Sequence, residues 1–267
     1  MRLTTLTLSC LVAFSTLAPF AAAQTIPAAT FAKRADYTDA DLSPNGEFIA
    51  VRTPFEDRHA MTIIKLSGDY SGQVIRFPDA KETVGTGVWS DDSRLLVMKA
   101  IDIGSLRQPL LNGDIYAVDA DTGKQEQIFG YLKDTSNRRS RLKDEGNTYF
   151  LRTLPGSGGD ALFIFRPWLQ GNSDNITSVF RANTHTGTRK QVDSIKDRVG
   201  YWADNAGVPR LMYGVNLDGS PWMKYRPAST LDSPWQPVPA ALAAREMFID
   251  HFEPDNNIAY AWINDKS

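Results

Sequence analysis

Short apolar runs recur along the chain, each preceded by a cluster of turn residues. The first is Phe-Ile-Ala-Val at 48–51, which follows Ser-Pro-Asn-Gly at 43–46 after one glutamate. Proline presets φ at the second position of a tight turn, asparagine tolerates the third, and glycine takes the left-handed fourth. An apolar run of this length bounded by turn residues is typical of a strand buried on both faces. The pattern therefore predicts a turn over 43–46, followed by the inner strand of a sheet.

The same turn and strand return at regular intervals. An ungapped copy occupies 89–98, 47 residues later, and a third copy occupies 252–261. Looser copies place the turn at 158–160 before the apolar run 161–165, and at 204–207 before 211–215. The turns end near positions 46, 93, 159, 207 and 256. A period in the forties with several short strands per unit predicts the blades of a β-propeller.

A second repeated element supports this interpretation. Asp-Ala-Asp-Thr-Gly-Lys at 119–124 separates the predicted strands 114–119 and 125–129, and Asn-Thr-His-Thr-Gly-Thr at 183–188 separates 178–182 and 189–192. Both segments predict the outer hairpin of a blade. We therefore expect an all-β fold, a β-propeller of four-stranded antiparallel blades with about five blades present. The last blade is expected to be incomplete, since only 264–267 follow its presumed inner strand at 258–263. Tryptophans are expected to fill the wedges between blades; the six lie at 89, 168, 202, 222, 235 and 262.

The N-terminal segment is typical of a secretory signal peptide. Arg2 precedes an apolar stretch over 3–20, and three alanines at 21–23 form a small-residue cleavage site. We expect 1–23 to be removed, 24–40 to be a lead-in segment and 41–267 to be the partial propeller domain. An uncleaved membrane anchor is the alternative. Cys10 would leave with the signal, so the mature protein would have neither disulfides nor a thiolate. The expected location is periplasmic or secreted, with no membrane attachment after cleavage.

The charge balance excludes one class of function. The formal net charge is −2, with 29 basic and 31 acidic residues, which predicts no nucleic-acid or anionic-membrane footprint. The loop over 131–147 interleaves basic and acidic side chains. It is either a solvated connection between blades or a contact surface, and the sequence leaves both open.

The sequence lacks the motifs of catalytic and phosphate-binding sites. The segment Pro-Gly-Ser-Gly-Gly at 155–159 approaches the Gly-x-Ser-x-Gly motif of a serine hydrolase, but Pro155 takes the first glycine position and a strand follows. His59, His185 and His251 are each solitary in the sequence. The glycines at 85–87 lack the third glycine and the helix of a phosphate loop. We therefore predict no catalytic, cofactor-binding or metal-binding residue in this chain, and no cofactor.

The acidic residues are explained by turn chemistry. Seven of them occupy turns, where their side chains can accept hydrogen bonds from local backbone amides; they are Asp41, Asp91, Asp92, Asp121, Asp204, Asp218 and Asp255. A five-bladed glycosidase would instead need two acids facing each other across the central channel. It stays a weaker alternative.

The lead-in Phe-Ala-Lys-Arg-Ala-Asp-Tyr at 31–37, followed by Asp-Leu-Ser-Pro-Asn-Gly-Glu-Phe-Ile-Ala-Val at 41–51, resembles the start of bacterial secreted peptidases of the prolyl oligopeptidase family. This family includes dipeptidyl aminopeptidases and acylaminoacyl peptidases. In it, an N-terminal propeller precedes an α/β-hydrolase domain that carries the catalytic serine, aspartate and histidine.

The resemblance covers 24–267 and lacks the hydrolase domain, so it transfers no catalytic residue to this chain. It implies a non-catalytic propeller that controls the access of small peptides to that missing domain, its partner. Such a propeller alone should hydrolyse nothing. The alternative is a free-standing TolB-like periplasmic propeller that acts as a protein-interaction module. The gene sequence beyond the codon for Ser267 would separate the two.

Overall fold

The computed structural model describes residues 37–104, 108–131, 144–168 and 175–264, which belong to one compact unit. The predicted signal peptide at 1–23, all but the last residues of the lead-in, and positions 132–143 of the 131–147 loop lie outside the described residues. The prediction of a cleaved signal therefore stays a prediction.

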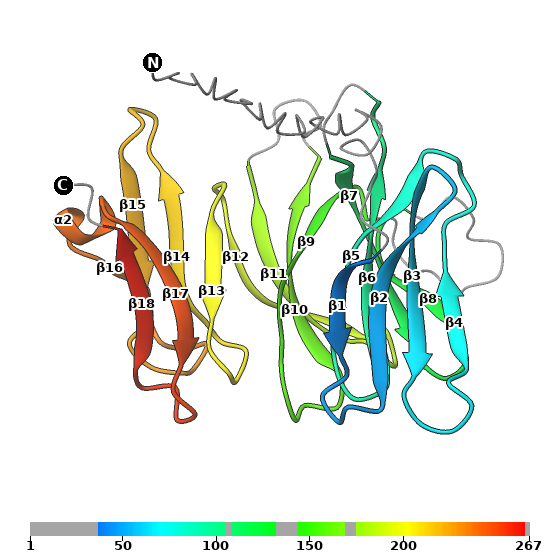
Figure 1. Ribbon diagram of the computed structural model, residues 1–267. Helices are drawn as coiled ribbons and strands as arrows, with labels where there is room; N and C mark the ends of the chain where they lie inside the picture. The colour runs from blue at the N-terminus through cyan, green and yellow to red at the C-terminus, as the bar shows by residue number, and fades with distance from the viewer. Residues whose placement is uncertain (1–36, 105–107, 132–143, 169–174, 265–267) are drawn as a thin grey trace, which may run out of the picture. The chain divides into compact units, whose positions relative to one another are not determined.

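Within the described residues, eighteen strands form five antiparallel sheets, which we number blade 1 to blade 5 in chain order (Figure 1). Blade 1 contains β1 (Thr38–Leu42), β2 (Phe48–Phe55), β3 (Arg58–Lys65) and β4 (Gly72–Ile75). Blade 2 contains β5 (Glu82–Trp89), β6 (Arg94–Ile101), β7 (Leu110–Asp119) and β8 (Gln125–Phe129). Blade 3 contains β9 (Gly146–Thr153), β10 (Asp160–Pro167), β11 (Thr177–Asn183) and β12 (Arg189–Ile195). Blade 4 contains β13 (Gly200–Ala203), β14 (Pro209–Val215), β15 (Pro221–Tyr225) and β16 (Gln236–Pro237). After the short helix α2 (Ala240–Ala243), blade 5 contains β17 (Glu246–Phe252) and β18 (Ala259–Asn264).

Each of the first four sheets has its strands in sequential order, and the fifth sheet has two strands. Every pairing is antiparallel. This is the all-β arrangement of a partial β-propeller, so the predicted fold class is confirmed.

The recurring turn joins the first strand of each blade to the second. One backbone hydrogen bond closes it in all five blades: Ser43 N–H to Phe48 O, Ser90 to Arg94, Leu154 to Asp160, Asp204 to Val208, and Glu253 to Ile258, at 2.8–3.0 Å. In blade 1 the Ser43 hydroxyl also accepts a 3.0 Å hydrogen bond from the Phe48 amide. The repeat is therefore structural. The apolar run after each turn is the second strand, so its assignment as the inner strand was wrong.

The outer hairpins match their prediction. The turns between β7 and β8 and between β11 and β12 have glycine in the left-handed region, with φ of 68° at Gly123 and 66° at Gly187. Each turn also reaches the preceding blade. The Asp121 carbonyl accepts a 2.9 Å hydrogen bond from Gln73 of blade 1, and the Thr184 hydroxyl lies 2.9 Å from that of Ser90 in blade 2. The outer hairpins therefore tie neighbouring blades together.

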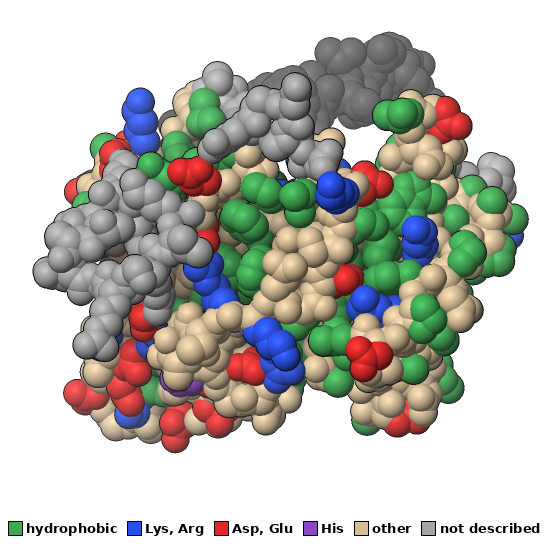
Figure 2. All heavy atoms as spheres, turned by 180° about the vertical axis from the view of Figure 1, so that it is seen from behind, with side chains coloured by type: hydrophobic (Ala, Val, Ile, Leu, Met, Phe, Trp, Pro, Cys, Tyr) green, Lys and Arg blue, Asp and Glu red, His purple; other side chains and the backbone are tan. Residues whose placement is uncertain are grey.

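Three apolar clusters fill the spaces between consecutive blades 1 to 4. In the first cluster Phe48 and Trp89 lie 6.2 Å apart between their ring centres, and in the second Phe129 and Phe163 lie 4.8 Å apart. The third contains Tyr201, with Trp222 and Trp235 packed against it. Three of the predicted wedge tryptophans thus pack as expected, whereas Trp168 and Trp262 are exposed. On the face seen in Figure 2, acidic and basic side chains are interspersed, with hydrophobic side chains between them.

Candidate functional site

A cavity of about 730 Å³ opens beside strands of blades 1, 2 and 3. It lies at the ends of β5, β6 and β7 that are opposite to the recurring blade turn. Its lining comes from the segment after β4, all four strands of blade 2, and the edges of β9 and β10: Phe77, Pro78, Asp79, Glu82, Lys99, Ile101, Asn112, Asp114, Tyr116, Gln127, Tyr131, Gly146 and Trp168. We call it the blade 2 cavity.

Lys99 is held between two carboxylates in this cavity. Its Nζ lies 2.8 Å from Glu82 Oε1 and 2.6 Å from Asp114 Oδ2, and the three side chains are largely buried. Burial by itself would lower the pKa of Lys99, but the hydrogen bonds with Asp114 and Glu82 outweigh burial and raise that pKa. Lys99 therefore stays a cation. The amide of Asn112 donates a further 2.9 Å hydrogen bond to Asp114 Oδ2.

Aromatic rings form the walls of the blade 2 cavity. Phe77 and Tyr116 lie 5.1 Å apart between ring centres, and burial raises the pKa of the Tyr116 phenol, which therefore stays protonated at neutral pH. Tyr131 and Trp168 form a second pair at 5.9 Å. These two side chains are 39% and 45% exposed, so the cavity has aromatic surface in contact with solvent. The Trp168 indole donates to Asn147 Oδ1 at 3.2 Å, which fixes the ring.

No residue of this site was predicted from the sequence. The members of its ion-pair cluster, Glu82, Lys99 and Asp114, lie on β5, β6 and β7, and antiparallel pairing brings them together across 15–17 positions of sequence. One signal was available. Lys99 directly follows the apolar residues of the repeat copy at 89–98, and a charged residue in a buried strand must be paired.

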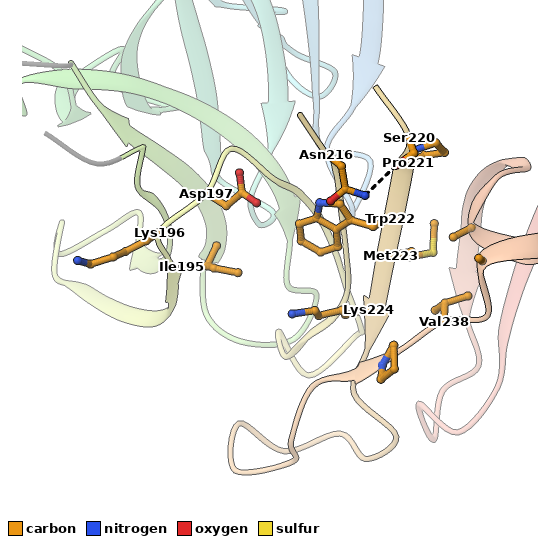
Figure 3. A pocket seen from close by; sticks show the side chains of 13 residues that line it. Ile195, Lys196, Asp197, Asn216, Ser220, Pro221, Trp222, Met223, Lys224 and Val238 are labelled. Atoms are coloured by element: carbon orange, nitrogen blue, oxygen red, sulfur yellow. Dashed lines mark hydrogen bonds between the residues drawn. The ribbon is translucent and has the colours of Figure 1, made fainter. Parts of the chain in front are cut away.

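A second cavity, of about 580 Å³, lies beside β15 (Figure 3). Trp222, Met223 and Val238 give it apolar surface, and the Lys224 ammonium lies 5.4 Å from the Trp222 ring centre. Lys196 and Asp197 at the end of β12 complete its polar lining. This cavity offers apolar surface with charges at its edge.

A third cavity, of about 330 Å³, lies between β9, β13 and β17, the first strands of three blades. Arg152 donates hydrogen bonds to the Ala203 carbonyl at 2.6 Å and to Asn205 Oδ1 at 3.1 Å. Asp250 Oδ2 lies 2.8 Å from His251 Nδ1, and hydrogen bonds with His251 and Trp262 lower the pKa of Asp250.

Two histidines that stand alone in the sequence have carboxylate partners in the structure. His185 Nε2 bonds to Asp91 Oδ2, which lies 94 residues away in sequence, and His251 bonds to its neighbour Asp250. In the described part of the chain, no hydroxyl bonds to the second ring nitrogen of either histidine. The third histidine, His59, donates its backbone amide to Thr83 Oγ1 at 2.9 Å.

The serine of the 155–159 segment lies in a turn before β10, as the sequence predicts. Ser157 Oγ donates to the Leu154 carbonyl at 2.5 Å and accepts a 3.1 Å hydrogen bond from the Asp160 amide. Four of the predicted turn aspartates also accept from local amides at 2.9–3.1 Å: Asp91, Asp204, Asp218 and Asp255. Asp121 instead bonds to Lys65 Nζ at 2.9 Å.

Within residues 37–104, 108–131, 144–168 and 175–264, no three histidine, cysteine or acidic side chains are grouped closely enough to hold a metal ion. Over the same ranges, no helix has the length and apolar character needed to cross a bilayer.

No family model matches the chain, and no curated protein matches it. Among solved structures, it is similar to an oligogalacturonate lyase from Vibrio parahaemolyticus, at 15% identity over 84% of this chain and 70% of that one, with a TM-score of 0.37. A TolB-type protein from Agrobacterium tumefaciens is 13% identical over 71% of this chain and 58% of that one, with a TM-score of 0.34. The AtxE2 isopeptidase is 10% identical over 83% of this chain and 44% of that one, with a TM-score of 0.24. Because these TM-scores are below 0.5, the fold assignment rests on the strand order.

Proposed function

We propose that this chain is a non-catalytic propeller that admits and holds small peptides for the α/β-hydrolase domain of an exported serine peptidase. The turn and lead-in resemblance to the prolyl oligopeptidase family supports the peptidase assignment. The signal-like segment at 1–23 supports an exported location.

The use of buried charges for cohesion is the observation that carries the non-catalytic part of the proposal. Asp204 pairs with Arg210 at 3.2 Å within blade 4, and Arg226 pairs with Asp193 at 3.3 Å between blades 4 and 3. Arg210 also donates to the Asn256 carbonyl at 2.7 Å, and Arg226 donates to the carbonyls of Ser233 and Pro209 at 3.0 and 3.3 Å. Groups used in this way supply shape and rigidity, and they are not free to act as a nucleophile or a base.

The purified chain should be assayed on chromogenic dipeptide and acyl-amino-acid substrates, with and without a serine-directed inhibitor. The proposal expects no turnover above the rate of buffer alone. Turnover that the inhibitor abolishes would contradict it. A full-length peptidase of the family, assayed in parallel, confirms that substrate and inhibitor work.

A free-standing interaction module is the second candidate, and the surface of blade 5 favours it. Phe248, Tyr260 and Trp262 on β17 and β18 are exposed, and large exposed apolar side chains grouped on one sheet are typical of protein contact surfaces. This candidate expects a monomer that gains no peptidase activity when a hydrolase domain of the family is supplied. The first candidate expects the propeller to bind that domain.

A further inference from the structure

We infer that the blade 2 cavity binds a cationic side chain, an alkylammonium or guanidinium group carried by a peptide. This inference rests on the proposed function, because it names the kind of peptide that the propeller would hold. It depends on the cavity itself, on the charge of its lining and on the aromatic pair at its solvent-exposed side.

The charge of the lining selects a cation. Three carboxylates, those of Asp79, Glu82 and Asp114, line the cavity together with one ammonium, that of Lys99. The lining therefore carries a formal charge of −2, and a cavity lined by one excess charge concentrates ligands of the opposite sign. An anionic ligand would meet repulsion from all three carboxylates.

The single charge of Lys99 compensates only one of the two buried carboxylates. Lys99 contacts Glu82 through Oε1 and Asp114 through Oδ2. Asp114 is only 8% exposed, and a buried charge that is not fully compensated is costly. A cationic ligand would compensate the remaining negative charge, and ammonium and guanidinium groups donate hydrogen bonds without accepting them.

The aromatic pair suits the same ligand. A cation is attracted to the face of an indole or phenol ring when it lies within about 6 Å of the ring centre. Lys99 Nζ already lies 5.7 Å from the Phe77 ring centre inside the cavity. Tyr131 and Trp168 offer two further rings where the cavity meets solvent. The apolar stem of a lysine or arginine side chain can lie against these rings while its charge reaches the carboxylates.

The test is titration calorimetry on the whole chain at low salt with three blocked tripeptides. Acetyl-Ala-Arg-Ala-amide is the probe, the same peptide with citrulline is its neutral isostere, and the peptide with glutamate is the anionic control. We expect the arginine peptide to bind at least about tenfold more tightly than the citrulline peptide, and to weaken as salt is raised.

Two substitutions with matched controls locate the site. Asp79→Asn removes the exposed charge. It keeps a side-chain oxygen, which can still accept the hydrogen bond that Asp79 Oδ1 receives from the Lys81 amide at 3.0 Å. It should weaken arginine-peptide binding about two- to fivefold, whereas Asp255→Asn, at an equivalent turn remote from the cavity, should not. Trp168→Ala should also weaken binding about two- to fivefold, and Trp262→Ala, which removes an exposed tryptophan from blade 5, should not.

Circular dichroism of each variant confirms folding before titration. Equal binding of the arginine and citrulline peptides would overturn the cation inference and leave peptide holding intact. Absence of arginine-peptide binding to folded protein, or tighter binding of the glutamate peptide, would also overturn it. The inference would also be overturned if Asp255→Asn and Trp262→Ala weakened arginine-peptide binding as much as Asp79→Asn and Trp168→Ala do. Chromatography of the recovered peptide reports cleavage separately, so failure of the non-catalytic proposal is visible independently of affinity.

Discussion

Replacing the buried Asp204 should destabilise the protein more than replacing any of the turn aspartates at the surface. The carboxylate of Asp204 is fully buried in the turn between β13 and β14. It accepts hydrogen bonds from the amides of Ala206 at 3.1 Å and Val208 at 2.9 Å, from Arg210 Nη1 at 3.2 Å, and from the Ser229 hydroxyl at 2.6 Å. One side chain thus closes the turn, neutralises a buried guanidinium and holds the loop after β15.

The expected magnitude follows from those four contacts. Removing one member of a buried ion pair costs about 3–5 kcal/mol, because the other charge is left without compensation. Each unsatisfied buried neutral donor adds about 1–3 kcal/mol, less where water enters the space left by the side chain. These penalties overlap because the donors share one carboxylate, so we expect Asp204→Ala to lower the free energy of unfolding by about 3–5 kcal/mol.

Asp218→Ala is the matched control. Asp218 accepts from the amide and hydroxyl of Ser220 in the turn before β15, but that turn is exposed and water can replace the carboxylate. Its loss should cost about 1 kcal/mol or less. The measurement is urea unfolding at neutral pH, followed by circular dichroism and by tryptophan fluorescence, with coincident transitions required. Equal losses in the two variants would refute the reasoning.

Three further outcomes are expected. In the same urea assay, Gly159→Ala should lower the free energy of unfolding by at least about 1 kcal/mol more than Gly158→Ala. Both glycines have a positive φ, 87° and 72°, so the backbone strain is similar. Only at 159 would the new Cβ meet a neighbour, Asp91 Oδ2 at 2.7 Å. The pKa of Asp91 lies below its ordinary value, since hydrogen bonds from the Ser93 amide and His185 outweigh burial, which raises it. The Asp91 carboxylate therefore contributes stability above about pH 4, and this stability is lost as pH falls through the folded-state pKa. Asp91→Asn should make the unfolding free energy depend less on pH over that acid range. An unchanged slope of unfolding free energy against pH would contradict this. In native-state hydrogen exchange, the amides of β17 and β18 should exchange faster than those of β6 and β10, and equal protection would contradict the account of blade 5 given below.

The sequence predicts the parts of this fold that local chemistry determines. The turn at 43–46 needs only its own residues, since the Ser43 hydroxyl bonds to Asn45 and to the Phe48 amide and Gly46 takes a φ of 72°. The outer hairpins are equally local. Second strands were found because they are apolar on both faces, as in β6, where all residues but the last are buried.

The first strands of blades 1 and 2 were missed because they have no apolar run. β1 reads Thr-Asp-Ala-Asp-Leu and is mostly exposed, and β5 contains two glycines within Thr-Val-Gly-Thr-Gly-Val. Those glycines reflect packing with other strands, which no local pattern reveals. A Cβ at Gly85 would lie 2.5 Å from Leu111, and one at Gly87 would lie 2.7 Å from Met61. The blade 2 cavity was missed for the same reason, because its charges meet through strand pairing.

The contact between blades 4 and 5 differs from the others in its chemistry. None of the three apolar clusters includes a residue of β17 or β18. Instead, Arg210 donates a 2.7 Å hydrogen bond to the Asn256 carbonyl, and its guanidinium lies 5.6 Å from the Phe252 ring centre. Asn205 donates hydrogen bonds to the carbonyls of Phe252 and Glu253 at 3.1 and 2.9 Å.

Hydrogen bonds of this kind contribute about 0.5–1.5 kcal/mol each after exchange with water, up to about 3 kcal/mol where the donor is charged. Burying one large apolar side chain contributes about 1.5–3 kcal/mol, and each of the other contacts between blades buries several. The hydrogen bonds at blade 5 have defined directions, so they fix its orientation while adding less stability than an apolar wedge. Since Asn205 and Arg210 are also held by the turn that Asp204 organises, the position of blade 5 depends on that one buried carboxylate.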